Sequence, residues 1–265
     1  MLIDAHAHFH SDRSPRANWQ ALNARRLAAG ERIGITAHVA SILGSWGARS
    51  PVYFPSTDDV EHANDAMLAI ARAHPGLVFG YCFVNPNDTE HALTEIERRH
   101  AAGMIGIKLA ASRRADDPLL DPIAELAGEH GLPILHHVWQ HRRHEWPGQE
   151  ASDGAELCAL AERHPGTRFI LAHLGGGGDW QHTLRVVPDV PNVWVDLSGS
   201  GLDGGMLEAA IDAVGARRLL WGADITLDTA FAKLRYLEAL GLPQDDLTAI
   251  RSGNAEAIFP AGCFR

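Results

Sequence analysis

Short apolar segments alternate with helical segments along the whole chain of 265 residues, and this alternation limits the fold more than any other feature. Eight segments predict strands, because each is short, rich in β-branched or aromatic residues, and closed by glycine, proline or a polar residue. They cover residues 2–6, 34–42, 77–84, 104–109, 132–137, 168–173, 192–197 and 218–222. Eight strand-then-helix units without a linker of biased composition predict an α/β protein, a closed (β/α)8 TIM barrel that forms a single domain over residues 1–265.

The intervals between these strands carry helical periodicity. Val60, Ala63, Met67 and Ile70, for example, share one face of the first predicted helix. The predicted helices cover residues 59–73, 89–102, 122–130, 155–164, 206–214, 231–240 and 246–258. Residues 9–32 are expected to form a long first crossover, and residues 41–56 a long loop. An open, doubly wound sheet is the alternative fold, but the segment AHAHFHSDRS after the first strand is not the glycine-rich phosphate turn that such sheets often carry.

Composition excludes two classes of partner. The 33 acidic residues outnumber the 23 basic ones, giving a net charge of -10, and no basic stripe appears, so nucleic acid and anionic membranes are not expected as partners. No apolar run approaches the roughly 18 residues of a membrane span. Asp4, His6 and His8 interrupt the apolar start, where a secretory signal needs a continuous apolar stretch. Three widely spaced cysteines favour reduced thiols and a cytoplasmic location.

Polar side chains gather where the predicted strands end, which is where the active site of such a barrel is built. They are His6 and His8, Lys108, His136 and His137, His173, Asp196, and Asp224. Residues two apart on a strand share a face, so His6 and His8 are expected to point together into the barrel mouth. Imidazole nitrogens with a carboxylate are suitable ligands for a divalent metal such as Zn²⁺. The sequence therefore predicts a metal site that uses both of these histidines, one histidine of the fifth strand, and Asp224.

Seven motifs occur in a fixed order between residues 2 and 259: HAH after the apolar start, IKL, PILHHVW, FILAHLGG, VWVDLSG, LLWGAD and a closing GNAEAIF. Together they resemble the amidohydrolase superfamily. More narrowly, they are similar to its amidohydrolase-related branch of metal-dependent TIM-barrel hydrolases and decarboxylases. HAH alone is a weak signal, whereas the ordered set is specific.

The resemblance implies a set of metal ligands. His6 and His8 would bind the metal, and His137 rather than His136 would be the ligand of the fifth strand, because the ligand of the family follows the proline of that strand by four residues. Asp224 would bind the metal and also serve as the general base.

The resemblance also implies roles for two further side chains. His173 would polarise the substrate or act as an acid, or would bind a second metal ion in a binuclear site. Lys108 occupies the position that some members of the superfamily carboxylate to bridge two metal ions. A lysine paired with an acidic side chain is the alternative for Lys108. The branch often continues this strand as Lys-Leu-His, whereas this chain has Lys108, Leu109 and Ala110, so the role of the fourth strand is left open.

Loop residues are expected to contact the substrate. Trp46 and Arg49 follow the second predicted strand, and Trp139 and Arg142 follow the fifth. Arginine suits bidentate binding of a carboxylate, and tryptophan suits an aromatic or apolar wall. These residues are therefore the candidates for binding an acidic small molecule. Asp196 is expected to hold loop backbone or to orient a site histidine.

Three functions remain open from the sequence. The first expectation is a metal-dependent hydrolase in which metal-activated water attacks an amide, ester or lactone carbonyl of a small substrate. The second is a metal-dependent decarboxylase of a small aromatic or enoic acid, and the third is a barrel that binds metal or ligand without turnover. One or two divalent ions per chain are expected, with zinc as the first choice. A monomer and a homo-oligomer are both open.

Overall fold

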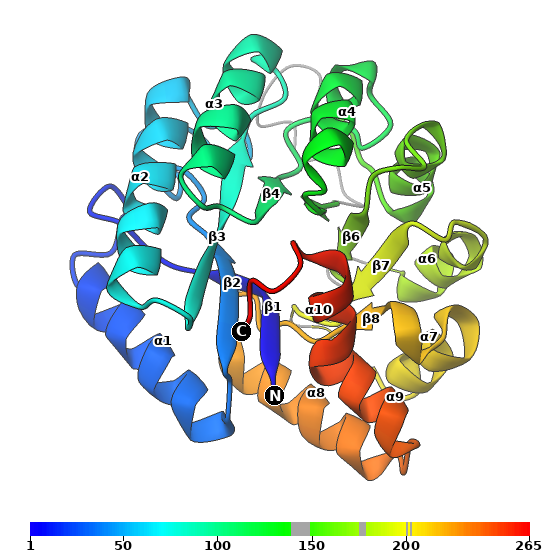
Figure 1. Cartoon of the computed structure of the whole chain (residues 1–265). Coiled ribbons are helices and arrows are strands. Elements are labelled where there is room, and N and C mark those ends of the chain that lie inside the picture. The colour runs from blue at the N-terminus through cyan, green and yellow to red at the C-terminus, as the bar shows by residue number, and fades with distance from the viewer. Residues whose placement is uncertain (139–148, 175–178, 200, 202) are drawn as a thin grey trace.

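Eight parallel strands form one sheet in the order of the sequence, and helices surround it (Figure 1). The computed structural model describes residues 1–138, 149–174, 179–199, 201 and 203–265. The strands are β1 (Ile3–His8), β2 (Ala37–Ser41), β3 (Val78–Val84), β4 (Gly106–Leu109), β5 (Ile134–His137), β6 (Phe169–Ala172), β7 (Val193–Asp196) and β8 (Leu219–Leu220). A parallel bridge between Ala7 and Asp224 brings β1 beside the segment after β8. The predicted (β/α)8 barrel is confirmed.

All the helices but the last, α10, occupy the outer ring around the strands, as Figure 1 shows. The helices are α1 (Trp19–Ile33), α2 (Thr57–Ala73), α3 (Thr89–Ala101), α4 (Asp121–His130), α5 (Gly154–Arg163), α6 (Trp180–Val186), α7 (Met206–Val214), α8 (Leu227–Ala239), α9 (Gln244–Thr248) and α10 (Asn254–Ile258). The prediction of one helix over residues 246–258 differs from the structure, in which a π-helical turn (Ala249–Gly253) separates α9 from α10. This turn and α10 pack against β8, over the end of the barrel where the strands begin.

Two helices lie where the sequence pattern gave none. The predicted crossover of residues 9–32 contains most of α1, whose buried residues are only Asn23 and Gly30, so no apolar stripe marks it. The helix α6 begins after Asp179, whose carboxylate accepts hydrogen bonds from two backbone amides of its first turn. The strand β2 is shorter than predicted because Gly34 ends α1 with a φ of 85°, which glycine adopts without strain.

A bulge in β1 sets the direction of the two histidines at its end. The register pairs Asp4 with His38 and Ala7 with Ala40, so three steps along β1 match two along β2. Ala5 and His6 both lie within this irregular stretch. Ala5 belongs to the cluster of apolar side chains that fills the barrel, and His6 turns toward the barrel mouth, two residues before His8, as the period of two predicts.

Asp4 lies on the opposite side of β1 and joins three elements. Its carboxylate is fully buried and is 3.0 Å from both Arg26 Nη2 of α1 and His38 Nδ1 of β2. Its other oxygen accepts a hydrogen bond of 2.8 Å from the backbone amide of Ala223, immediately before Asp224. Burial raises the pKa of Asp4, but the hydrogen bond from His38 and the charge of Arg26 outweigh burial and hold the pKa below its usual value.

Loss of the Asp4 charge is expected to destabilise the barrel. The change Asp4→Asn leaves a buried guanidinium without its carboxylate, so we expect the free energy of unfolding to fall by about 3 kcal/mol in urea titrations. Asp58→Asn is the control, because Asp58 is 64% exposed in its pair with Arg13. Its effect should stay below about 1 kcal/mol. Equal effects of the two changes would contradict the role given to Asp4.

Candidate functional site

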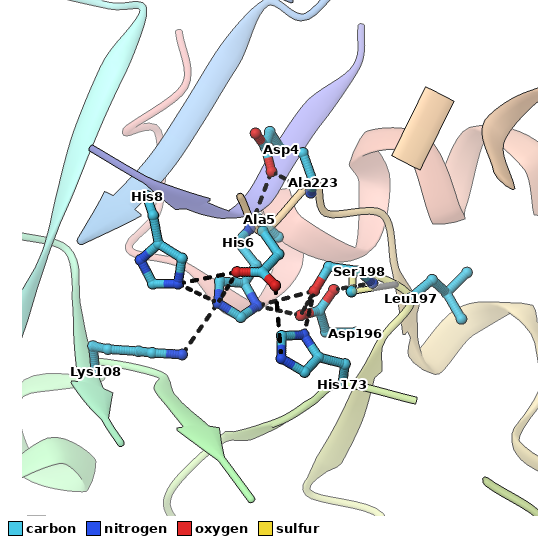
Figure 2. Close-up of polar contacts among 12 residues, drawn as sticks. Asp4, Ala5, His6, His8, Lys108, His173, Asp196, Leu197, Ser198 and Ala223 are labelled. Atoms are coloured by element: carbon cyan, nitrogen blue, oxygen red, sulfur yellow. Dashed lines mark hydrogen bonds and ion pairs between the residues drawn. The ribbon is translucent and has the colours of Figure 1, made fainter. Parts of the chain in front are cut away.

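Most of the predicted site residues meet at the ends of the strands, around a cavity of about 140 Å³. Figure 2 shows His6, His8, Lys108 and His173 close together at this end of the barrel. The lining of the cavity consists of five polar residues, His8, Lys108, His137, His173 and Asp224, and five others, Leu43, Trp46, Tyr53, Ala110 and Ile225. His6 lies directly behind this surface and is fully buried. The structure thus brings together side chains from β1, β4 and β5 and from the residues after β6 and β8.

The two histidines of β1 direct their Nε2 atoms toward one point. His6 Nδ1 is 2.6 Å from Asp196 Oδ2, and His8 Nδ1 is 3.3 Å from the carbonyl oxygen of Ser41. Because these oxygens accept, the neutral rings carry their protons on Nδ1 and their lone pairs on Nε2. The two Nε2 atoms are only 3.1 Å apart. Two lone pairs at this separation repel each other, so the pair is suited to hold a cation.

A carboxylate completes this arrangement. Asp224 Oδ1 is 3.3 Å from His8 Nε2 and 3.9 Å from His6 Nε2, and one ligand atom from each of the three residues falls within 4.8 Å of the other two. Burial lowers the pKa of both His6 and His8, which favours the neutral imidazoles that metal ions require. Burial raises the pKa of Asp224, but its contacts with His8, His6 and His173 outweigh burial and lower the pKa, so this group is a carboxylate at neutral pH.

His137 lines the same cavity. Its ring stacks on Tyr53 at a centroid distance of 5.5 Å and meets His173 edge-on at 5.0 Å. It is absent from the described three-residue groups whose ligand atoms all lie within 4.8 Å of one another. His137 therefore lines the cavity without joining the close group formed by His6, His8 and Asp224. His136 is buried, and its Nδ1 lies 3.1 Å from the carbonyl oxygen of His137.

Asp196, Ser198 and His173 form a continuous chain of hydrogen bonds beside His6 (Figure 2). Asp196 Oδ1 accepts from the Ser198 amide at 2.7 Å, and Oδ2 lies 2.6 Å from Ser198 Oγ. Ser198 Oγ lies 2.8 Å from His173 Nδ1. Asp196 therefore holds loop backbone and also orients His6, which are the two roles expected of it. Burial raises the pKa of Asp196 to about 6, so the carboxylate form dominates at neutral pH.

Lys108 places a cation beside the histidines. It is 1% exposed, and its Nζ donates to His6 Nε2 at 3.1 Å. Burial lowers the pKa of Lys108 to about 8, against the attraction of Asp224 and Asp196. A minor but real neutral fraction therefore exists at neutral pH, and only a neutral lysine amine can be carboxylated.

Hydrogen bonds to β1 hold the backbone of Asp224 in an uncommon conformation. Its φ is 51°, in the left-handed region that few residues other than glycine adopt. Its amide donates to the carbonyl oxygen of His6 at 2.6 Å, and the preceding amide of Ala223 donates to Asp4. This local conformation directs the carboxylate toward His8 and His173, and the contacts to β1 hold it there.

Of the four loop residues predicted to bind substrate, the structure places two. Trp46 lines the cavity, and its indole nitrogen donates to the carbonyl oxygen of Phe9 at 3.1 Å while its ring edge faces His8. Arg49 is 54% exposed and lies 3.4 Å from Asp58 of α2, so it does not line the cavity. Trp139 and Arg142 lie outside the described residues.

Sequence reasoning did not single out several residues that shape the site. Tyr53 and Leu43 come from the long loop after β2, and Ile225 follows Asp224. Only Ser198 had a signal, because it stands in the motif VWVDLSG. The others had none, since loop residues carry no periodicity that predicts their direction.

Solved structures with the same fold cover almost the whole chain. The 2,6-dihydroxybenzoate decarboxylase from Rhizobium is 18% identical, with 97% of this chain and 98% of that chain covered and a TM-score of 0.74. The 5-carboxyvanillate decarboxylase from Novosphingobium aromaticivorans, complexed with manganese and 4-hydroxy-3-methoxy-5-nitrobenzoic acid, is 17% identical, with 97% and 95% covered and a TM-score of 0.74. A structure described as amidohydrolase II is 17% identical, with 97% and 99% covered and a TM-score of 0.72.

A family model described as amidohydrolase matches residues 3–261. The chain therefore belongs to the amidohydrolase family, which confirms the resemblance of its motifs. No functionally curated protein matches it in sequence. Within the described ranges, no helix has both the length and the apolar character needed to cross a membrane.

Proposed function

We propose that the protein is a metal-dependent decarboxylase of a small, planar aromatic or enoic acid. The observation that carries this proposal is the composition of the cavity, in which half of the lining residues are imidazoles, a lysine and a carboxylate, and half are aromatic or aliphatic. A cavity of about 140 Å³ can hold a molecule of about one aromatic ring, because a protein cavity of about 150 Å³ is large enough to bind benzene. The apolar part fits the faces of such a ring, and the polar part fits its carboxylate.

The donor set fits a divalent metal ion. His6 Nε2, His8 Nε2 and Asp224 Oδ1 would hold it, with His137 as the fourth ligand. When bound, the ion supplies positive charge that orients and polarises the oxygens of the substrate. Imidazole and carboxylate accept both zinc, which the sequence suggests first, and manganese, which the decarboxylase from Novosphingobium aromaticivorans contains.

The side chains of this chain supply the charge and the proton for the reaction. Lys108 attracts the carboxylate of the substrate into the buried cavity. In the reaction, the bond between the ring carbon and the carboxyl carbon breaks, its electron pair stays on the ring carbon, and CO₂ leaves. The same ring carbon then takes up one proton, so that one carboxylate ion and one proton give one decarboxylated product and one CO₂.

Asp224 and His173 are the groups that can deliver this proton. Asp224 Oδ1 faces the histidines of β1, while its Oδ2 lies 3.8 Å from His173 Nε2. One oxygen of the carboxylate therefore faces the proposed metal position, and the other oxygen faces His173. One water molecule between His173 Nε2 and Asp224 Oδ2 would allow a proton taken from solvent to pass between these atoms before it reaches the ring carbon.

Hydrolysis of an amide, ester or lactone is the second candidate, and the position of Asp224 favours it. A carboxylate next to two imidazoles that face one point is also the arrangement of a general base for metal-activated water. The protein described as amidohydrolase II shares the barrel. A barrel that binds metal or ligand without turnover is the third hypothesis, and the experiments below separate all three.

Metal binding is the first test. We expect the purified, metal-stripped protein to take up about one equivalent of Mn²⁺ or Zn²⁺ in calorimetric titrations, and His8→Ala to weaken binding at least about 100-fold because it removes one ligand. His38→Gln is the matched control, because His38 is a buried histidine of the neighbouring strand that contacts Asp4 instead of the cavity. Failure of the wild-type protein to bind either ion would rule out both enzymatic hypotheses.

The reaction itself is the second test. The metal-loaded protein is incubated with 2,6-dihydroxybenzoate, with 5-carboxyvanillate and with simple lactones and esters, and products are followed by proton NMR together with CO₂ release. We expect CO₂ from at least one acid, and a loss of about 1,000-fold in kcat for Asp224→Asn, which keeps the shape but not the charge. Ring opening or ester cleavage without CO₂ would favour the hydrolase. Metal binding without any turnover would favour the binding protein.

A further inference from the structure

A buried lysine outside the cavity holds the turn that follows β7. Lys233 of α8 is 1% exposed. Its ammonium donates to three successive carbonyl oxygens, those of Leu197, Ser198 and Gly199, at 2.9, 3.0 and 2.9 Å. All three donors of the ammonium are therefore used, and the turn is wrapped around one positive charge.

This turn packs directly against His173. Gly199 has a φ of 81°, and a Cβ atom at this position would lie 2.9 Å from His173 Cγ. Any side chain here would displace the imidazole ring. The preceding residue, Ser198, reaches the same ring through its hydroxyl group, at 2.8 Å from Nδ1. The position of the turn consequently determines the position of His173.

The hydrogen bonds of Ser198 also determine which nitrogen of His173 carries the proton. The Asp196 carboxylate can only accept, and its Oδ2 lies 2.6 Å from Ser198 Oγ, so the hydroxyl proton of Ser198 points to Asp196. The oxygen of Ser198 must then accept from His173 Nδ1–H. His173 therefore presents the lone pair of Nε2 to the cavity, where Asp224 Oδ2 lies 3.8 Å away.

We propose that Lys233 is a positioning residue. It holds the turn of residues 197–199, and Ser198 in this turn holds His173 in one orientation and one tautomer. The effect on turnover rests on the proposed function, whereas the effect on the tautomer does not. Without the ammonium, three carbonyl oxygens that converge on one buried point repel one another and the turn must open. Ser198 then moves away from His173 Nδ1, and the imidazole is free to exchange its tautomers.

A second cation in the barrel serves as the matched control. The guanidinium of Arg218 donates to the carbonyl oxygens of Val187, Pro188 and Val190 at 3.2, 2.9 and 2.7 Å. It precedes β8, so it lies at the opposite end of the barrel from the cavity. Loss of this charge also opens a turn, but that turn does not contact His173.

The experiment compares Lys233→Met with Arg218→Met in the Zn²⁺-loaded protein. Long-range proton–nitrogen NMR spectra report the tautomer of each imidazole, and His173→Gln assigns the signals of His173. We expect the Nδ1–H tautomer alone in the wild type and in Arg218→Met, and a mixture of tautomers in Lys233→Met. Where turnover is measurable, Lys233→Met should lower kcat about tenfold or more and change KM less than about twofold, while Arg218→Met lowers only the unfolding temperature.

Ser198→Ala covers the case in which Lys233→Met does not fold. It removes the acceptor of His173 Nδ1 and leaves Lys233 in place, so it should give the same mixture of tautomers. A folded Lys233→Met or Ser198→Ala protein that keeps the wild-type signals of His173 overturns the proposal, as does a wild type with the proton on Nε2. If the wild type converts none of the acids or esters, the proposed function fails, and the NMR spectra still decide the role of Lys233.

Discussion

The closure of the barrel between its first and last strands is the constraint on which the site depends. The carbonyl oxygen of His6 accepts from the amides of Ala223 and Asp224, at 3.2 and 2.6 Å, and Asp4 accepts from the same Ala223 amide. These contacts join two ends of the chain and set the left-handed conformation of Asp224. The carboxylate reaches His6 and His8 only because β1 and the residues after β8 are neighbours in the sheet.

The sequence predicted the barrel and the residues at its rim because both follow from local rules. Strand segments end in polar residues, and parallel strands that end at one rim bring His8, Lys108, His173 and Asp224 together. The rule of alternation predicted that His6 and His8 share a face, but the bulge that turns this face toward the mouth has no sequence signal. The helix α1 escaped prediction because it buries almost no apolar side chain.

Three buried charges among the described residues each have specific polar partners. Asp4 lies against Arg26 and His38, Lys233 against three carbonyl oxygens, and Asp196 against Ser198 and His6. Such contacts compensate for the free energy that a charged group loses when it is removed from water. Each of them also restricts the orientation of a neighbouring group. The sequence could not show these partners, because they come from separate strands, helices and loops that only the packing of the barrel brings together.

The site combines residues of the first strand with residues that follow the last strand, and this affects when the site can form during synthesis of the chain. The proposed ligand atoms of His6 and His8 leave the ribosome long before those of Asp224, and no local segment of the chain can approximate their arrangement. Contacts of such long sequence separation form late, because the closure of the whole intervening chain precedes any gain from them. A nascent chain therefore carries the two histidines before the rest of the proposed site exists. On the proposed function, full metal affinity would arise only when the barrel closes, and metal loading would mark the completion of folding.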